Sequence, residues 1–192
     1  MTVTRLRLVL WAAVALALAA VGLAWAARAP EAVAPFRPEF ALQDAEGRPV
    51  TSADLAGRFQ LVFFGFTHCP DVCPTTLAEV AQVMDDLGPE ADRVQPVFVS
   101  VDPARDRADL GAYTAAFHPS ILGLWGDEAA TEAAAASFRI FYGREDDPAA
   151  PDGYTMAHFP GLTLVSPEGD WLRLYDYGTP AADILADLRS RL

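Results

Sequence analysis

LVFFGFTHCPDVCPTTLAEVAQVMDDL, residues 61–87, decides the fold of this chain. Its first six residues are nearly all apolar, which is typical of a strand that is buried on both faces. From Thr75 to Leu87 the apolar residues recur at helical spacing, and Gly88-Pro89 predicts the end of that helix. The stretch therefore predicts a buried strand, a tight turn that contains both cysteines of the chain, and a helix.

The flanking sequence continues this alternation of strands and helices. In chain order we expect a hairpin of strands at 40–42 and 49–51, a buried strand at 94–101, a helix at 105–117, a short strand at 121–125, a helix from Asp127 as its cap to Phe138, a hairpin of strands at 162–165 and 171–175, and a helix at 181–192. The polar stretch 139–157 predicts an irregular loop. Parallel βαβ units followed by an antiparallel hairpin and a last helix predict an α/β, thioredoxin-like fold with helices flanking a mixed sheet.

The charge balance of the chain is acidic. Its 26 acidic and 14 basic residues give a net charge of -12. Nucleic-acid binding needs a basic face that neutralises phosphates, so this composition argues against it. A cationic partner and a merely solvated surface both remain open.

The N-terminal stretch is strongly apolar. Residues 8–27 form an uncharged run of 20 residues, which as a helix would span the roughly 30 Å hydrocarbon core. Arg5 and Arg7 precede the run, so the positive-inside rule predicts a single-pass anchor in the cytoplasmic membrane. The alternative is a cleaved signal peptide, because 24–26 has the small-x-small form that a signal peptidase reads. We thus expect a cytoplasmic N-terminus at 1–7, an anchor at 8–27, a linker at 28–38, and a domain at 39–192 that faces the periplasm.

The cysteines, Cys69 and Cys73, lie where the first buried strand ends and a helix begins. This edge of an open α/β sheet is where ligands bind, and a helix N-terminus lowers the pKa of a thiol. Three intervening residues allow both sulfurs to contact one ion, and soft thiolates favour Cu(I), zinc or iron–sulfur clusters. Two cysteines are too few for a cluster or a structural zinc site, so copper fits best. A plain disulfide remains the alternative.

Of three histidines, His158 is the expected third ligand. It precedes the strand at 162–165, and in this fold that region faces the cysteine turn. His68 belongs to the turn itself, and His118 is expected to cap a helix or lie on the surface. Asp102, which ends the second buried strand, and Asp71, which lies between the cysteines, are candidates to orient a ligand by hydrogen bonding. Capping the following helix is the alternative role for Asp102.

The chain resembles the SCO/SenC family of cytochrome c oxidase assembly proteins. The resemblance covers about residues 40–192 and rests on FGFTHCPDVCP, on SVDPARD, and on a single His just before a strand that is followed by Pro-x-Gly. It implies one copper ion, Cu(I) or Cu(II), bound by Cys69, Cys73 and His158. One departure is visible: the family usually has an acidic residue before this His and a small one after it, where this chain has Ala157 and Phe159.

The resemblance also implies a role and partners. It predicts a copper metallochaperone for the CuA centre in subunit II of cytochrome c oxidase, with another periplasmic copper chaperone as a candidate donor. The alternative is a membrane-anchored thiol–disulfide reductase that keeps the CuA-site cysteines reduced, with Cys69 and Cys73 as its redox-active pair. Whether the protein is an enzyme therefore stays open. A peroxidase is disfavoured, because neither Phe66 nor Pro70 is the Thr or Ser expected three residues before a peroxidatic cysteine.

Overall fold

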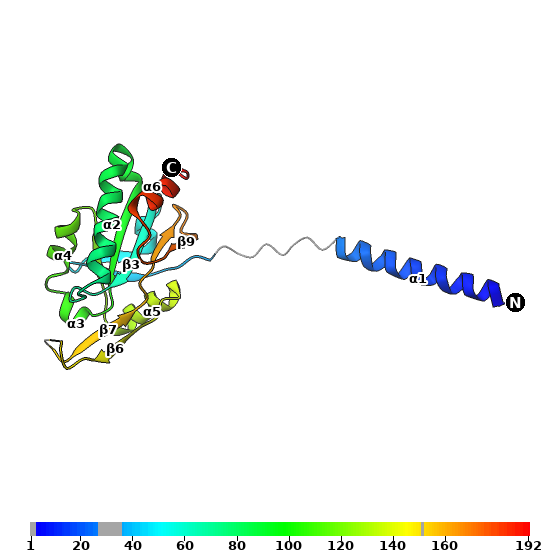
Figure 1. Ribbon diagram of the computed structural model, residues 1–192, viewed down its shortest axis with the longest axis horizontal. Helices are drawn as coiled ribbons and strands as arrows, with labels where there is room; N and C mark the ends of the chain where they lie inside the picture. The colour runs from blue at the N-terminus through cyan, green and yellow to red at the C-terminus, as the bar shows by residue number, and fades with distance from the viewer. Residues whose placement is uncertain (1–2, 27–35, 151) are drawn as a thin grey trace. The chain divides into compact units, whose positions relative to one another are not determined.

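The computed structural model describes residues 3–26, 36–150 and 152–192 (Figure 1). The chain divides into two compact units, residues 1–34 and 35–192. Of the predicted linker, residues 28–35 lie outside the described ranges. The start of the second unit is bound to the region of its strand β9, Trp171–Tyr175, since the Phe36 carbonyl accepts from Trp171 N–H and the Arg37 guanidinium pairs with Asp170 at 2.6 Å.

The first unit contains helix α1, Val3–Ala26. Within the described ranges, no helix combines the length and apolar character that a membrane crossing requires.

The second unit is built on a mixed seven-stranded sheet with the order β2-β1-β5-β4-β3-β8-β9. Its central strand β3 pairs in parallel with β4 and antiparallel with β8, and β4 pairs in parallel with β5. Every residue of β3 and β4 is buried, as expected for strands covered on both faces. The strands of this sheet are β1 Ala41–Asp44, β2 Pro49–Thr51, β3 Phe59–Gly65, β4 Val94–Ser100, β5 Leu122–Trp125, β8 Leu162–Val165 and β9 Trp171–Tyr175.

Helices cover the sheet, with α2 against α6 and α4, and α5 against β1 (Figure 1). Helix α2 ends at Leu87, and the C-cap residue Gly88 has a φ of 55° that suits glycine, so the predicted stop is confirmed. Asp127 caps α5 as predicted, because its carboxylate accepts from Ala130 N–H at 2.8 Å. The helices of this unit are α2 Val72–Leu87, α3 Pro103–Asp106, α4 Leu110–Phe117, α5 Glu128–Phe138 and α6 Ala181–Arg189, with short 3-10 turns η1 Ser52–Leu55 and η2 Gly88–Arg93.

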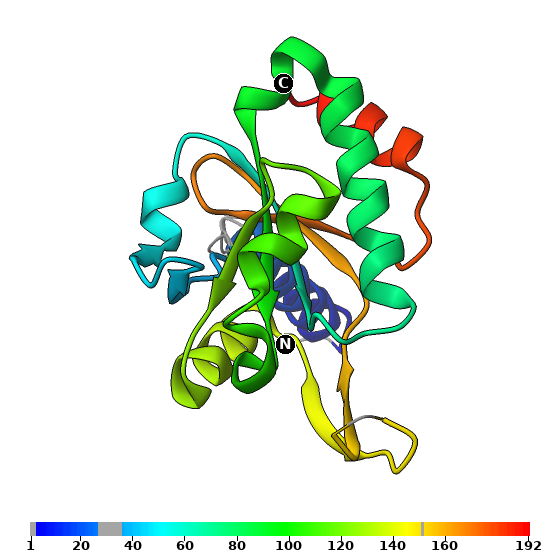
Figure 2. The same cartoon turned by 90° about the vertical axis from the view of Figure 1, so that its left-hand side faces the viewer.

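The predicted mixed sheet with flanking helices is confirmed, but two local predictions are wrong. The single helix expected at 105–117 is two helices, α3 and α4, which are separated by a turn at 107–109. The irregular loop expected at 139–157 is instead largely an antiparallel ribbon of β6, Tyr142–Asp146, and β7, Tyr154–His158. Its residues are half-buried or exposed, so the ribbon lacks the apolar alternation that would reveal strands. The ribbon projects from the body of the domain (Figure 2).

Candidate metal centre

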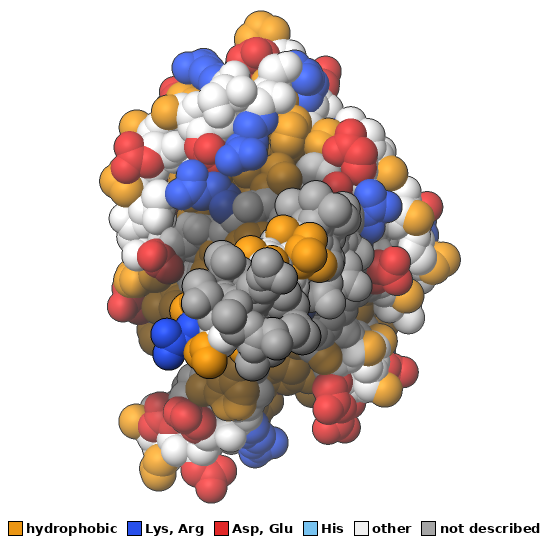
Figure 3. Space-filling model, turned by 90° about the vertical axis from the view of Figure 1, so that its right-hand side faces the viewer, with side chains coloured by type: hydrophobic (Ala, Val, Ile, Leu, Met, Phe, Trp, Pro, Cys, Tyr) orange, Lys and Arg blue, Asp and Glu red, His pale blue; other side chains and the backbone are white. Residues whose placement is uncertain are grey.

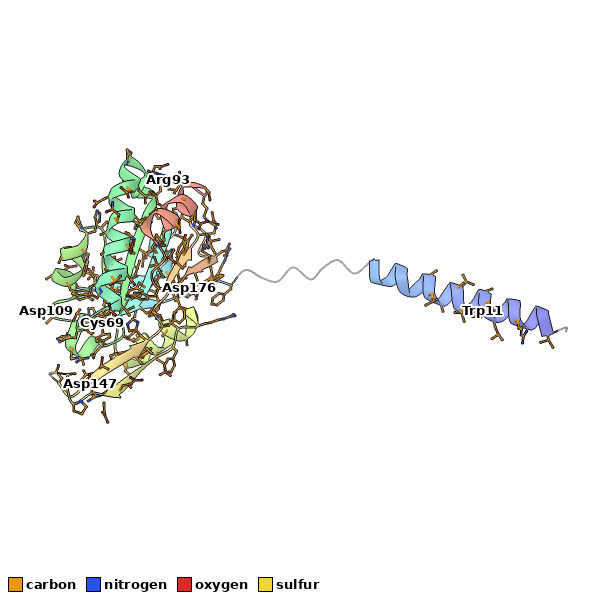
Figure 4. The ribbon with its side chains drawn as sticks, viewed as in Figure 1. Trp11, Cys69, Arg93, Asp109, Asp147 and Asp176 are labelled. Carbon is orange, nitrogen blue, oxygen red and sulfur yellow. The ribbon has the colours of Figure 1, made fainter. Side chains whose placement is uncertain are left out.

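The cysteine turn joins the end of β3 to the start of α2. Cys69 N–H donates to the Phe66 carbonyl at 3.2 Å, and Cys73 lies in the first turn of α2. Cys73 is fully buried, whereas Cys69 is half-buried, and both are free thiols. Cys69 lies at the N-terminal end of α2, near the base of the β6–β7 ribbon (Figure 4).

Gly65 makes room for the buried sulfur. A Cβ atom at this position would lie 2.7 Å from Cys73 Sγ and 3.0 Å from ring carbons of Phe63 and Phe98. Real Cβ atoms essentially never come as close to another heavy atom as 2.7 Å, and 3.0 Å is tighter than nearly all real contacts, so a side chain here would displace the sulfur and crowd the rings. The glycine therefore lets the start of α2 approach the end of β3.

His158 is the last residue of β7, so the ribbon carries it to the cysteines. Its Nε2 lies 3.5 Å from Cys73 Sγ, and its Nδ1 lies 3.2 Å from the carbonyl oxygen of Phe159. When the ring proton is on Nδ1, it donates to that carbonyl, and the Nε2 lone pair then faces the sulfurs as a ligand would. The rings of Phe63 and Phe66 meet the imidazole edge to face, at centroid distances of 5.8 and 5.7 Å. These contacts fix the plane of the imidazole.

The two sulfurs and the imidazole nitrogen all lie within 4.8 Å of one another. Three donors around one ion at bond lengths of about 2.0–2.3 Å stand roughly 3.5–4 Å apart, so small movements suffice to bring all three onto one ion. Two soft sulfurs and one imidazole suit copper in a low-coordinate site. The donor set that the sequence predicts is therefore brought together by the fold.

The two thiols differ in acidity. Hydrogen bonding from the Cys73 thiol lowers the pKa of Cys69 to about 3; burial opposes this shift, and His158 and the backbone N–H groups of Asp71 and Cys73 add to it. The pKa of Cys73 is raised, first because its proton is held by the Cys69 thiolate and then because the side chain is buried. The pair thus holds one accessible thiolate and one buried thiol.

The other predicted residues surround the centre. The Asp102 carboxylate accepts from Arg105 and, at 3.2 Å, from the Tyr154 hydroxyl, and its side chain does not cap α3. Because Tyr154 begins β7, these contacts tie the ribbon that carries His158 to the end of β4. The backbone N–H of Asp71 contributes to the lowered pKa of Cys69, and the Asp71 carboxylate lies 3.5 Å from the Tyr177 hydroxyl.

The remaining histidines and Met156 lie outside the three-donor group. His68 Nδ1 lies 3.0 Å from Thr67 Oγ1, and its side chain is 45 % exposed. His118 ends α4 and lies 2.7 Å from Ser120 Oγ, in agreement with its predicted capping or surface role. Met156 packs against the hydrophobic core.

The sequence did not single out the buried carboxylate beside the cysteine turn. Asp106 is 0 % exposed and accepts hydrogen bonds from Thr67 and from Ser100 Oγ. Burial raises its pKa, while the hydrogen bonds from Ser100 and Thr67 act against that rise. The SVDPARD motif contains it, but its partner Thr67 is 39 residues away in the chain. Sequence spacing alone therefore carries no signal for this contact.

Comparisons with known proteins agree on one family. The SCO1/SenC family model matches residues 28–192. The mitochondrial protein SCO2 homolog of Mus musculus is 36% identical over 159 residues, which cover 80% of this chain and 61% of that protein. The chain thus spans about three fifths of the length of the curated relatives of this type.

Solved structures give the same result. The structure of Bradyrhizobium japonicum ScoI with copper bound has a TM-score of 0.74 and 35% identity, covering 82% of this chain and 99% of that one. A structure of BsSco, described as a member of the Sco family of cytochrome c oxidase assembly proteins with a disulfide switch, has a TM-score of 0.62 and 26% identity, covering 82% and 94%.

Proposed function

Because this chain belongs to the SCO1/SenC family, we propose that it binds one copper ion as cargo and serves the assembly of cytochrome c oxidase. The observation that carries the proposal is the meeting of Cys69, Cys73 and His158 within 4.8 Å. A similar protein, ScoI of Bradyrhizobium japonicum, has been solved with copper bound, and BsSco is described as belonging to a family of oxidase assembly proteins.

The asymmetry of the two thiols suits a site that must release its metal. Cys69 and His158 are half-buried, so a partner can reach Cys69, whereas Cys73 is buried and would hold the ion from the inner side. A partner thiolate can add to a three-coordinate Cu(I) ion, after which the bond to Cys69 breaks and copper leaves by ligand exchange. We propose that the receiver is the CuA site in subunit II of cytochrome c oxidase, and that another periplasmic copper chaperone is a candidate donor.

The proposed location follows from the sequence. The uncharged run at 8–27 and the preceding Arg5 and Arg7 favour a single-pass anchor in the cytoplasmic membrane, with residues 28–38 as a tether and the domain in the periplasm. The surface fits a soluble domain, since acidic and basic side chains are interspersed over its visible face (Figure 3).

A second function, thiol–disulfide reduction, is favoured by the acid–base asymmetry of the cysteines. The Cys69 thiolate would attack a target disulfide and release one target thiolate, which takes up a proton. Cys73, once deprotonated, would then attack Cys69 and release the second target thiol. The target gains two electrons and the protein keeps a Cys69–Cys73 disulfide, which a periplasmic dithiol reductant must restore.

The experiment that separates the two functions is transfer to the isolated CuA domain of subunit II. We expect the reduced, Cu(I)-loaded protein to transfer copper to the reduced domain, and His158→Ala to lose most of this ability. His118→Ala is the matched control, because His118 contacts Ser120 and Asp85 away from the centre. Reduction of an oxidised CuA domain at the wild-type rate by His158→Ala, with no copper transfer by the wild type, would instead establish the reductase.

A further inference from the structure

Asp106 is a carboxylate with no exposed surface beside the proposed copper site. Its Oδ1 accepts from Thr67 N–H at 3.1 Å and from Thr67 Oγ1 at 2.7 Å, and its Oδ2 accepts from Ser100 Oγ at 2.6 Å. Burying a carboxylate is costly unless hydrogen bonds compensate for the lost hydration. Two of its three bonds go to one residue of the cysteine turn, so the compensation depends on the position of that turn.

Thr67 lies in the cysteine turn, between Phe66, whose ring contacts His158, and the ligand Cys69. It follows Phe66, whose ring meets His158 edge to face and whose carbonyl accepts from Cys69 N–H. Both the backbone and the side chain of Thr67 are held by Asp106, which fixes the path of the chain as it leaves β3. A shift of Thr67 would therefore move Cys69 relative to His158.

We infer that Asp106 is a positioning residue, which acts through Thr67 to hold the cysteine turn in the arrangement where both sulfurs face His158. It touches neither the sulfurs nor the imidazole through a hydrogen bond in the described part of the chain. The inference deepens the proposed copper-binding function and rests on it, but the dithiol arrangement that Asp106 stabilises can also be measured without metal.

The two oxygens of Asp106 supply a matched pair of variants. Thr67→Val removes a hydroxyl that bonds Oδ1 from the cysteine turn, whereas Ser100→Ala removes a hydroxyl that bonds Oδ2 from the end of β4. Each hydroxyl also makes one further contact: Thr67 Oγ1 lies 3.0 Å from His68 Nδ1, and Ser100 Oγ accepts from Asp102 N–H at 3.1 Å. Each variant therefore loses its bond to Asp106 and one neighbouring contact, so their stabilities should fall by similar amounts. If Asp106 positions the centre through Thr67, only the first variant should weaken copper binding.

The test is Cu(I) affinity of the reduced full chain, measured by competition with a chromogenic Cu(I) chelator. We expect Asp106→Ala to weaken binding by about 10- to 100-fold, as for other residues that orient metal ligands. Asp106→Asn keeps an oxygen that can accept from Thr67 and should recover most of the affinity. Thr67→Val should weaken binding roughly 2- to 12-fold, the factor that one hydrogen bond is worth, and Ser100→Ala should bind as the wild type does.

Equal affinities of the wild type and Thr67→Val, or equal losses in Thr67→Val and Ser100→Ala, would overturn the inference. A wild type that binds no Cu(I) would overturn the proposed function instead. In that case the inference about Asp106 is tested without metal, by the reduction potential of the Cys69–Cys73 couple. Loss of a group that holds the dithiol form should lower the potential in Thr67→Val, by about 30 mV for a tenfold change in the equilibrium constant, and an unchanged or higher potential would contradict it.

Discussion

Replacing Gly65 by alanine should damage the metal centre without touching a ligand. The added Cβ would lie 2.7 Å from Cys73 Sγ, against about 3.5–4.0 Å for an ordinary contact, so the two atoms must separate by roughly 1 Å. Ring carbons of Phe63 and Phe98 would also lie 3.0 Å from the added Cβ. The side chains of Cys73, Phe63 and Phe98 are each at most 1 % exposed. The sulfur therefore cannot move away without disturbing the core.

The magnitude follows from two opposing effects. Overpacking a core costs about 1–3 kcal/mol, and replacing glycine in a strand returns about 0.5–1 kcal/mol. Taking the middle of each range, the free energy of unfolding should fall by about 1 kcal/mol, which lowers Tm by roughly 2–4 °C in a domain of this size. Displacement of one sulfur should weaken Cu(I) binding about tenfold or more.

Thermal unfolding by circular dichroism and Cu(I) competition test both expectations. Gly143→Ala is the control, because its Cβ would lie 3.7 Å from the ring of Phe141, which is 73 % exposed and free to move. The cost of Gly65→Ala should also shrink in a Cys73→Ala background, where the clashing sulfur is absent. Wild-type stability and copper affinity in Gly65→Ala would refute the reasoning.

Two further predictions concern ionisable groups. In the reduced metal-free protein, iodoacetamide should alkylate Cys69 before Cys73, at a rate that stays flat between about pH 5 and 8 because the pKa of Cys69 is about 3; peptide mass spectrometry that finds Cys73 modified first would contradict this asymmetry. Burial opposes ionisation of Asp187, but hydrogen bonds from Arg191 and Tyr175 hold its pKa below the ordinary value. Its stabilising contribution is therefore present above the pKa of the unfolded chain and is lost as pH falls through the folded pKa. Tyr175→Phe should make the loss of stability on acidification shallower in urea unfolding, and a steeper loss would count against this assignment.

The central strand, the cysteine turn and α2 could be predicted from sequence because their pattern is local. An apolar run, a Pro-containing turn and helical spacing ending at Gly88 leave few alternatives. The same reasoning located Cys69 and Cys73 at the sheet edge and His158 opposite them. These three side chains were predictable because topology, rather than detailed packing, brings them together.

The β6–β7 ribbon and the role of Asp106 were not predicted, because both depend on contacts between residues that are far apart in the sequence. The β6–β7 ribbon has half-buried and exposed residues, and it is tied down by the Tyr154 hydroxyl at Asp102, 52 residues away. Asp106 looked like an ordinary polar residue near a helix start, and only the folded chain shows that it has no exposed surface. Polar residues carry no burial pattern of their own, so such sites emerge only once the partner segments are placed.

X-ray absorption spectroscopy of the reduced, Cu(I)-loaded chain tests the central claim most directly. The account predicts one copper per chain, bound by two sulfurs at about 2.2–2.3 Å and one nitrogen at about 2.0 Å, with the nitrogen lost in His158→Ala and retained in His118→Ala. A copper environment without two sulfurs, or one that His158→Ala leaves unchanged, would contradict it.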